Sequence, residues 1–313
     1  MSAMHQLLNA IIVICFIYVI AVLLKKKGIL LEENSLTLAR LVTDVCLPAI
    51  VFTGLAGQTI QVRELEPSAV MLMLEILCIL LAWGAARLLR FDLRKQGAVV
   101  FCSAFGSSTF LGYSIITQMY PGNQAAIGEA VLISEIGVGY PIFILGPMLA
   151  AYFSGKKSGL AASLGFFRSP VFFALIAGIL WGILHLPGEN SFLAPLFHLG
   201  SVLSGALTPL AIIAVGLMFR RPAVKSIAIP LAVVILIKLI LKPMIASVAG
   251  NALGFPDMWH DITVVLAAMP PAVLGAVYLR RYGGDASLAS ALLLTATILS
   301  AATLLGVFWL VGA

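Results

Sequence analysis

Charged residues are scarce in this chain: of 313 residues, 10% are Asp, Glu, Lys or Arg, while 61% are hydrophobic. A soluble domain carries about 25% charged residues, so this composition excludes a soluble globular protein and indicates an integral membrane protein. The longest stretch between apolar runs, about Ser154 to Ser169, is too short for a soluble domain. The net charge of +6 does not indicate nucleic-acid binding, because the basic residues fall in short loops between the apolar runs.

Catalytic and metal-binding motifs are also absent from the sequence. It contains no HExxH motif, no phosphate-binding P-loop and no nucleophile elbow, and no two of its His residues have helical i,i+4 spacing. The cysteines lie in apolar runs without metal-ligand spacing, which is typical of small buried hydrophobic residues. We therefore expect neither an enzyme, nor a cofactor, nor a metal site.

Long apolar runs are what the sequence has in abundance. A run of about 20 apolar residues crosses the hydrocarbon core as a helix. The first run is expected to stay as a span, because Lys25-Lys26-Lys27 follows it and no cleavage site is evident. The expected fold is an all-α integral membrane protein with ten transmembrane helices, at roughly 6–24, 35–57, 68–88, 97–120, 125–153, 169–186, 192–219, 226–249, 262–282 and 286–311.

The basic residues of the loops set the predicted orientation. Cytoplasmic loops of membrane proteins carry an excess of Lys and Arg. With ten spans, Arg63 alone falls on one side, which places both termini outside the cytoplasm in a cytoplasmic (inner) membrane. The opposite, cytoplasmic side carries Lys25, Lys26, Lys27, Arg87, Arg90, Arg94, Lys95, Lys156, Lys157, Arg168, Arg220, Arg221, Lys225, Arg280 and Arg281.

Two of the spans are interrupted in the middle. Gly106-Ser107-Ser108-Thr109-Phe110-Leu111-Gly112 breaks the fourth span, and Met269-Pro270-Pro271-Ala272-Val273-Leu274-Gly275 breaks the ninth. Glycine and consecutive prolines disfavour a continuous helix. Two broken spans in matching positions of two halves indicate a transporter built from inverted repeats. We expect a 5+5 inverted repeat with broken crossover helices 4 and 9, with the first five-helix repeat at 1–160 and the second at 161–313.

The breaks are the predicted substrate site. The second half of each broken helix begins near the midplane with unpaired backbone N–H groups and a positive dipole end, which together suit a carboxylate. Close packing of helices through small residues is the alternative explanation for Gly106 and Gly112. The residues predicted to bind substrate are Ser107, Ser108, Thr109, Gly112, Lys238, Pro270, Pro271 and Gly275.

Six ionisable residues lie well inside the predicted spans: Arg40, Asp44, Glu75, Glu135, Lys238 and Lys242. Each costs about 2.5–3.5 kcal/mol at the bilayer centre, so each needs a partner or a water-filled cavity. One interpretation is a set of fixed ion pairs that join helices. The other is that a carboxylate exchanges a proton or a cation during transport; the coupling candidates are Asp44, Glu135 and Glu75.

Several of these segments resemble the auxin efflux carrier family, over essentially the whole chain. The matching segments are Leu47-Pro48-Ala49-Ile50-Val51-Phe52, Phe110-Leu111-Gly112, Lys238-Leu239-Ile240-Leu241-Lys242-Pro243, Ala268-Met269-Pro270-Pro271-Ala272 and Arg281-Tyr282-Gly283-Gly284-Asp285. The resemblance implies carriage of organic anions. It also implies a fold similar to the bile acid sodium symporters, in which a core bundle with two crossing broken helices moves against a scaffold bundle like an elevator.

The sequence therefore predicts a secondary active transporter of small organic anions, auxin-like or mono- or dicarboxylates, that is proton-linked or a uniporter. A sodium-coupled symporter is the alternative, although the ninth-span break offers no carboxylate or amide ligand. A channel and an intramembrane enzyme are the remaining rivals. The expected partners are the organic anion and the lipid bilayer, with a homodimer left open and nucleic acid excluded.

Overall fold

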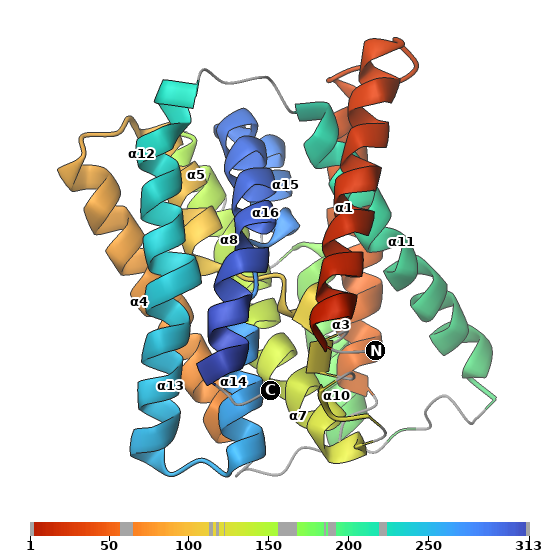
Figure 1. Cartoon of the computed structure of the whole chain (residues 1–313). Coiled ribbons are helices and arrows are strands. Elements are labelled where there is room, and N and C mark those ends of the chain that lie inside the picture. Colours follow the sequence, from red (N-terminus) through yellow and green to blue (C-terminus); the bar gives the residue numbers. More distant parts are fainter. Residues whose placement is uncertain are drawn as a thin grey trace.

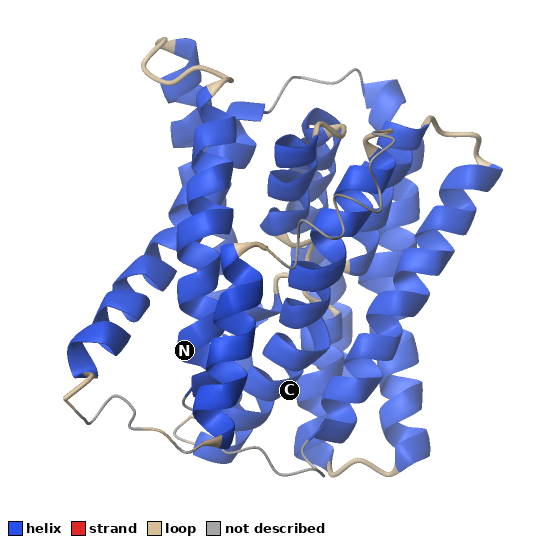
Figure 2. Cartoon of the chain, turned by 180° about the vertical axis from the view of Figure 1, so that it is seen from behind, coloured by secondary structure: helices blue, strands red, loops and turns tan. Residues whose placement is uncertain are grey.

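The computed structural model describes residues 3–56, 65–112, 115–116, 119–121, 123–155, 168–184, 186, 192–218 and 224–310. Apart from one isolated β-bridge, the regular structure of these residues is helical (Figures 1 and 2). The elements of the first half are α1 (Ala3–Lys26), α2 (Asn34–Leu41), η1 (Val42–Cys46), α3 (Leu47–Ala56), α4 (Glu66–Leu88), α5 (Leu93–Ala104), η3 (Ser108–Gly112), α7 (Gln124–Leu132), η4 (Ile133–Gly139) and α8 (Tyr140–Phe153). Those of the second half are α10 (Pro170–Ile183), α11 (Ala194–Met218), α12 (Val224–Val234), η5 (Ile235–Leu241), α13 (Lys242–Leu253), α14 (Asp257–Ala267), α15 (Val273–Tyr282) and α16 (Ala286–Leu310).

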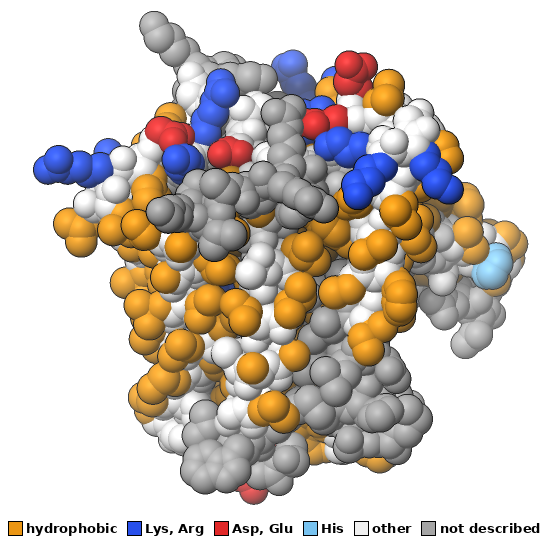
Figure 3. All heavy atoms as spheres, turned by 45° about the horizontal axis from the view of Figure 1, so that its top comes forward, with side chains coloured by type: hydrophobic (Ala, Val, Ile, Leu, Met, Phe, Trp, Pro, Cys, Tyr) orange, Lys and Arg blue, Asp and Glu red, His pale blue; other side chains and the backbone are white. Residues whose placement is uncertain are grey.

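The prediction of an all-α, multi-pass membrane protein is confirmed. Each of the ten predicted runs contains helical residues, and six helical segments are long and apolar enough to cross a membrane. Hydrophobic side chains cover the flank of the molecule, and Lys and Arg side chains gather at one end (Figure 3). The number of ten spans and the 5+5 inverted repeat stay predictions. The six segments are Asn34–Thr53, Glu66–Leu88, Gly128–Phe153, Ala194–Met218, Ile227–Leu253 and Ala286–Val307.

Three π-helical turns, η1, η4 and η5, interrupt otherwise α-helical spans. In each case the second residue beyond the turn is a proline, namely Pro48, Pro141 and Pro243. Proline has no N–H to donate and its ring crowds the preceding turn, and widening the helix locally accommodates both effects. Each of these turns also carries an ionisable residue, respectively Asp44, Glu135 and Lys238.

The helices pack in two groups. In the first, α11 lies against α1, α2 and α3, and α10 packs on α3. In the second, α4 packs on α5 and η4, α13 on α14, and α15 on α8 and α16. Figure 1 shows α1 and α11 on one flank of the molecule and α4, α12 and α13 on the other. Contacts of α15 and α16 with α11, and of α15 with α2, join the groups.

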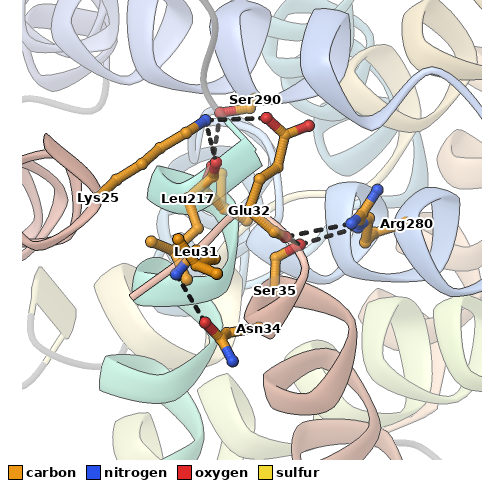
Figure 4. A network of polar contacts seen from close by, with 9 residues as sticks. Lys25, Leu31, Glu32, Asn34, Ser35, Leu217, Arg280 and Ser290 are labelled. Carbon is orange, nitrogen blue, oxygen red and sulfur yellow. Dashed lines mark hydrogen bonds and ion pairs between the residues drawn. The ribbon is translucent and has the colours of Figure 1, made fainter. Parts of the chain in front are cut away.

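Polar contacts at the basic end tie the two groups together (Figure 4). Lys25 pairs with Glu32 at 3.0 Å and donates to the Leu217 carbonyl at 2.6 Å, within the first group. From the second group, Arg280 at the end of α15 donates to the Ser35 hydroxyl at 2.8 Å and to the Glu32 carbonyl at 3.1 Å. The loop after α1 is thereby held against the end of α15.

Candidate functional site

The two interrupted segments meet inside the bundle. Helix α5 ends at Ala104 and helical structure resumes at Ser108, while α14 ends at Ala267 and α15 begins at Val273. The intervening residues pair as a short antiparallel bridge between Gly106 and Pro271. Figure 2 shows loop segments within the bundle as well as at its ends.

Backbone hydrogen bonds fix this crossing. The Ser107 N–H donates to the Pro270 carbonyl at 2.8 Å, and the Ala272 N–H donates to the Phe105 carbonyl at 2.9 Å. Phe105 and Ala272 both have extended backbone, with ψ of 132°. Pro270 and Pro271 have no N–H, so the pairing needs no donor from them. The peptide groups freed by the interruptions therefore satisfy one another across the two segments.

A small cavity opens beside the crossing. Its polar side chains are Ser107, Ser108 and Glu135, each 7% exposed or less. Its other lining residues are Leu47, Gly106, Val138, Gly139, Ile142, Phe143, Leu207, Ala272, Val273 and Leu274.

Two features of the cavity wall suit an anion. The Ser108 hydroxyl is buried and has no hydrogen-bond partner among the described residues. Helix α15 starts at the wall with Val273 and Leu274, and its N-cap residue Ala272 supplies no side-chain cap. The first N–H groups of a helix have no partner within the helix and attract negative charge.

The predicted glycines lie where backbones approach closely. A Cβ at Gly112 would overlap the Leu266 side chain of α14, and a Cβ at Gly275 would lie 3.0 Å from the Phe101 Cβ of α5. A Cβ at Gly106 would lie 2.7 Å from the Lys238 ammonium nitrogen. These glycines therefore lie at close contacts between segments and also near the crossing, so both explanations hold for them. The structure does not describe the side chain of Thr109, which was also predicted to bind substrate.

Lys238 and Lys242 lie behind the crossing, fully buried. Lys238 donates to the Ala267 carbonyl at 3.3 Å, and Lys242 donates to the Ala104 carbonyl at 2.9 Å. Those two carbonyls are at the C-terminal ends of α14 and α5, where a helix dipole favours a cation. Each lysine thus stabilises the end of one interrupted helix.

The three coupling candidates have three different surroundings. Glu75 pairs with Lys242 at 2.5 Å, with both side chains fully buried. Asp44 pairs with Arg281 and lines a second cavity, beyond Phe143, with Thr43, Ser169, Tyr278 and Tyr282. Glu135 alone of the three lines the cavity at the crossing.

Sequence reasoning missed the partner of Asp44. Arg40, four residues before Asp44, is exposed, and Arg281 of α15 reaches Asp44 instead. The sequence analysis placed Arg281 in a basic loop, although Arg281 follows the break in the ninth span closely. The apolar cavity residues Leu47, Phe143 and Leu207 were also not singled out. Nothing in an apolar run distinguishes a residue that lines a cavity from one that faces lipid.

The helical fold, with six segments long and apolar enough to cross a membrane, is that of an integral membrane protein. The chain belongs to the membrane transport protein family, which it matches over residues 6–152 and 154–308. The resemblance to the auxin efflux carriers is therefore confirmed.

Relatives named as transporters align with most of the chain. A transporter of Methanothermobacter thermautotrophicus is 26% identical, covering 97% of both chains. The transporter YfdV of Escherichia coli is 26% identical over 84% of this chain and 85% of its own. A Rhizobium meliloti protein, provisionally named a malonate transporter, is 28% identical over 67% of this chain and 66% of its own.

Proposed function

We propose that the chain is a secondary active transporter of small organic anions, which binds a carboxylate in the cavity at the crossing. The observation that carries the proposal is the pairing of the two interrupted segments beside a buried cavity with hydroxyl donors. The provisional naming of one relative as a malonate transporter agrees with an organic anion as the substrate.

The proposed architecture is ten spans arranged as two inverted repeats of five, 1–160 and 161–313. The support is the correspondence of elements: α5 with α14 as interrupted segments, and α4 with α12 to α13 as the spans before them. The glutamate of α4 and the lysine of α13 meet at the centre, as expected where two related halves face each other. Matching broken helices in two halves is the arrangement of many secondary transporters.

The proposed movement is an elevator-like displacement of the second helix group against the first. The cavity supports it, because Leu47 and Leu207 of the first group and Ser107, Glu135 and Val273 of the second both line it. A ligand between the groups would be released to either side as one group slides. The polar contacts of Arg280 and Arg281 with the first group would break during that movement.

The test compares a carboxylate with its neutral amide. Phenylacetate and phenylacetamide have nearly the same shape, and only the acid gains charge-assisted hydrogen bonds. Calorimetry on purified protein should show acid bound tighter than amide by about tenfold or more. Equal affinities for the acid and the amide would show that the bound ligand need not be an anion.

Two buried serines, one at the cavity and one away from it, provide a test of the binding site with a matched control. Ser108→Ala should weaken phenylacetate binding by about tenfold, since it removes one hydrogen bond to a charged group. Ser103→Ala removes an equally buried hydroxyl that has no partner among the described residues and does not line the cavity. If Ser103→Ala and Ser108→Ala have the same effect on affinity, the ligand does not bind at the crossing.

The alternatives make different predictions. A sodium-coupled symporter would show sodium-dependent binding. A channel would conduct without saturation or counterflow in proteoliposomes. Counterflow of labelled carboxylate with no sodium dependence would favour a proton-linked carrier or a uniporter.

A further inference from the structure

Two buried lysines stand beside a single buried glutamate at the crossing. Lys238, Lys242 and Glu75 are all fully buried. Glu75 pairs with Lys242 at 2.5 Å, whereas the hydrogen bond of Lys238 goes to the Ala267 carbonyl at 3.3 Å. Lys238 forms no ion pair with any carboxylate among the described residues. With both lysines protonated, the cluster would therefore hold one positive charge in excess.

Lys238 lies directly behind the wall of the cavity. A Cβ at Gly106 would lie 2.7 Å from the side-chain nitrogen of Lys238, and Gly106 itself lines the cavity beside Ser107 and Ser108. The Gly106 backbone therefore stands between this nitrogen and the place where the carboxylate is proposed to bind. Opposite charges at such short range attract strongly in a site that excludes most water.

An ammonium without a carboxylate partner is costly inside the bundle, because burial removes its hydration and a single carbonyl replaces little of it. The neighbouring Lys242 adds repulsion, since Lys242, Glu75 and Cys78 are the groups that act on the Lys238 charge. A neutral amine avoids both costs. It still donates to the carbonyl of Ala267, and it can accept a hydrogen bond from a neighbouring ammonium, which a second ammonium cannot do.

We propose that Lys238 is a neutral amine while the cavity is empty and takes up one proton when a carboxylate binds. The proton passes from water to the lone pair of the side-chain nitrogen, and it returns to water when the anion leaves. Each anion is then carried together with one proton, and the buried charge stays balanced in both states. This inference rests on the proposed function. It places the proton on a base behind the cavity rather than on Asp44, Glu75 or Glu135.

Other titratable groups surround this amine on several helices. η5 packs against α4, α5, α12, α13 and α16, and its lysine donates to a carbonyl of α14. The groups that act on it are Lys242 of α13 and Glu75 and Cys78 of α4. On α14, His260 and Asp261 contact each other at 3.3 Å. The other titratable side chains of these elements, towards the ends of their helices, are Glu66, Arg87, Arg94, Lys95, Cys102, Lys225 and Asp257.

The experiment follows phenylacetate binding by calorimetry between about pH 6 and about pH 9, where this acid is ionised throughout. Because the bound state holds one proton more than the free state, affinity should fall as pH rises, by up to about tenfold per pH unit. Measurements in two buffers of different ionisation enthalpy give the number of protons taken up with the anion. This number should rise towards about one as the pH increases.

Lys238→Met is the decisive variant, because methionine fills a similar space and cannot bind a proton. It removes a buried amine that has no carboxylate partner among the described residues, so the variant should fold. It should bind phenylacetate without proton uptake and with an affinity that does not change with pH. At about pH 6 it should bind about tenfold more weakly than the wild type, and the difference should narrow towards about pH 9.

Lys95→Met is the control. Lys95 lies at the start of α5 and approaches Asp92 at 3.9 Å, whereas the crossing is at the other end of this helix. Its side chain is 45% exposed, so its charge is held in water whether or not the cavity is occupied. The variant should keep the wild-type affinity, pH dependence and proton uptake.

Three outcomes would overturn the inference. Phenylacetate binding to the wild type without proton uptake over this range, or a Lys238→Met variant that keeps the wild-type pH dependence, removes Lys238 as the proton site and leaves the anion site standing. Loss of the pH dependence in Lys95→Met as well as in Lys238→Met would show that it does not arise at the crossing. If neither phenylacetate nor malonate binds at any pH, the proposed function itself is wrong, and this inference with it.

Discussion

Single buried charges hold the crossing together at the residue scale. The Lys242 ammonium contacts Glu75 of α4 and the Ala104 carbonyl of α5, so one side chain links three helices. A buried pair of this kind contributes little over a well-packed apolar pair, but a single unpaired member is costly. The pair therefore favours the interpretation of Glu75 as a structural residue.

We expect Lys242→Met to destabilise the protein by roughly 3–5 kcal/mol, because Glu75 would be left buried without its partner. The double change Lys242→Met with Glu75→Leu should recover most of that loss, except for about 1 kcal/mol from the Ala104 carbonyl. Chemical unfolding in detergent measures both. A double variant as unstable as the single one would show that the pair is not the source of the effect.

Close approach between interrupted segments is the feature that matters at the element scale. η3 and α14 touch at Gly112, where any Cβ would overlap the Leu266 side chain. A helical glycine in open space is the natural comparison, and a Cβ added at Gly84 of α4 would meet no other atom within 4 Å. Gly97 is a poor control, since its Cβ would lie 2.7 Å from the Phe153 Cβ.

Gly112→Val should reduce phenylacetate affinity by about tenfold or more in folded protein, because the added side chain forces η3 away from α14 and displaces the cavity wall. Gly84→Val should leave affinity unchanged. Size-exclusion chromatography and a thermal-shift assay establish that both variants are folded before calorimetry. Unchanged affinity in a folded Gly112→Val protein would argue against a role of the close contact in binding.

The orientation of the protein in the membrane is a property of the whole molecule. The loop after α1, the loop between α4 and α5, and the end of α15 carry the basic residues, and α1 begins and α16 ends towards the opposite end of the bundle (Figure 1). Positive loops stay in the cytoplasm, so both termini should lie outside it.

Single cysteines introduced at Ser2 and Ala313 should react with a membrane-impermeant thiol reagent added to intact cells. These positions lie outside the described residues, so the expectation comes from the loop charges alone. A cysteine at Arg90, in the basic loop between α4 and α5, should react after the cells are opened and not before. Protection of either terminal cysteine in intact cells would contradict the ten-span topology.

Composition and pattern determined the class of the protein. Apolar runs of membrane-spanning length leave little choice but helices, since backbone N–H and C=O groups have no water to bind in lipid. Gly106 to Gly112 and Met269 to Gly275 marked the interruptions because glycine and proline act locally on the backbone. The prolines after Asp44, Glu135 and Lys238 could also have indicated the π-helical turns, from the sequence alone.

Only the tertiary structure decided the surroundings of the ionisable residues inside the spans. The sequence placed Asp44, Glu75 and Glu135 inside spans and left both ion pairing and coupling open for them. The packing sets Asp44 against Arg281 and Glu75 against Lys242, and it places Glu135 at the wall of a cavity. Contacts between residues hundreds of positions apart depend on how whole helices pack, and an apolar run carries no signal for which face meets which neighbour. The distinction between a charge that joins helices and an acid that lines a cavity exists only once the bundle has formed.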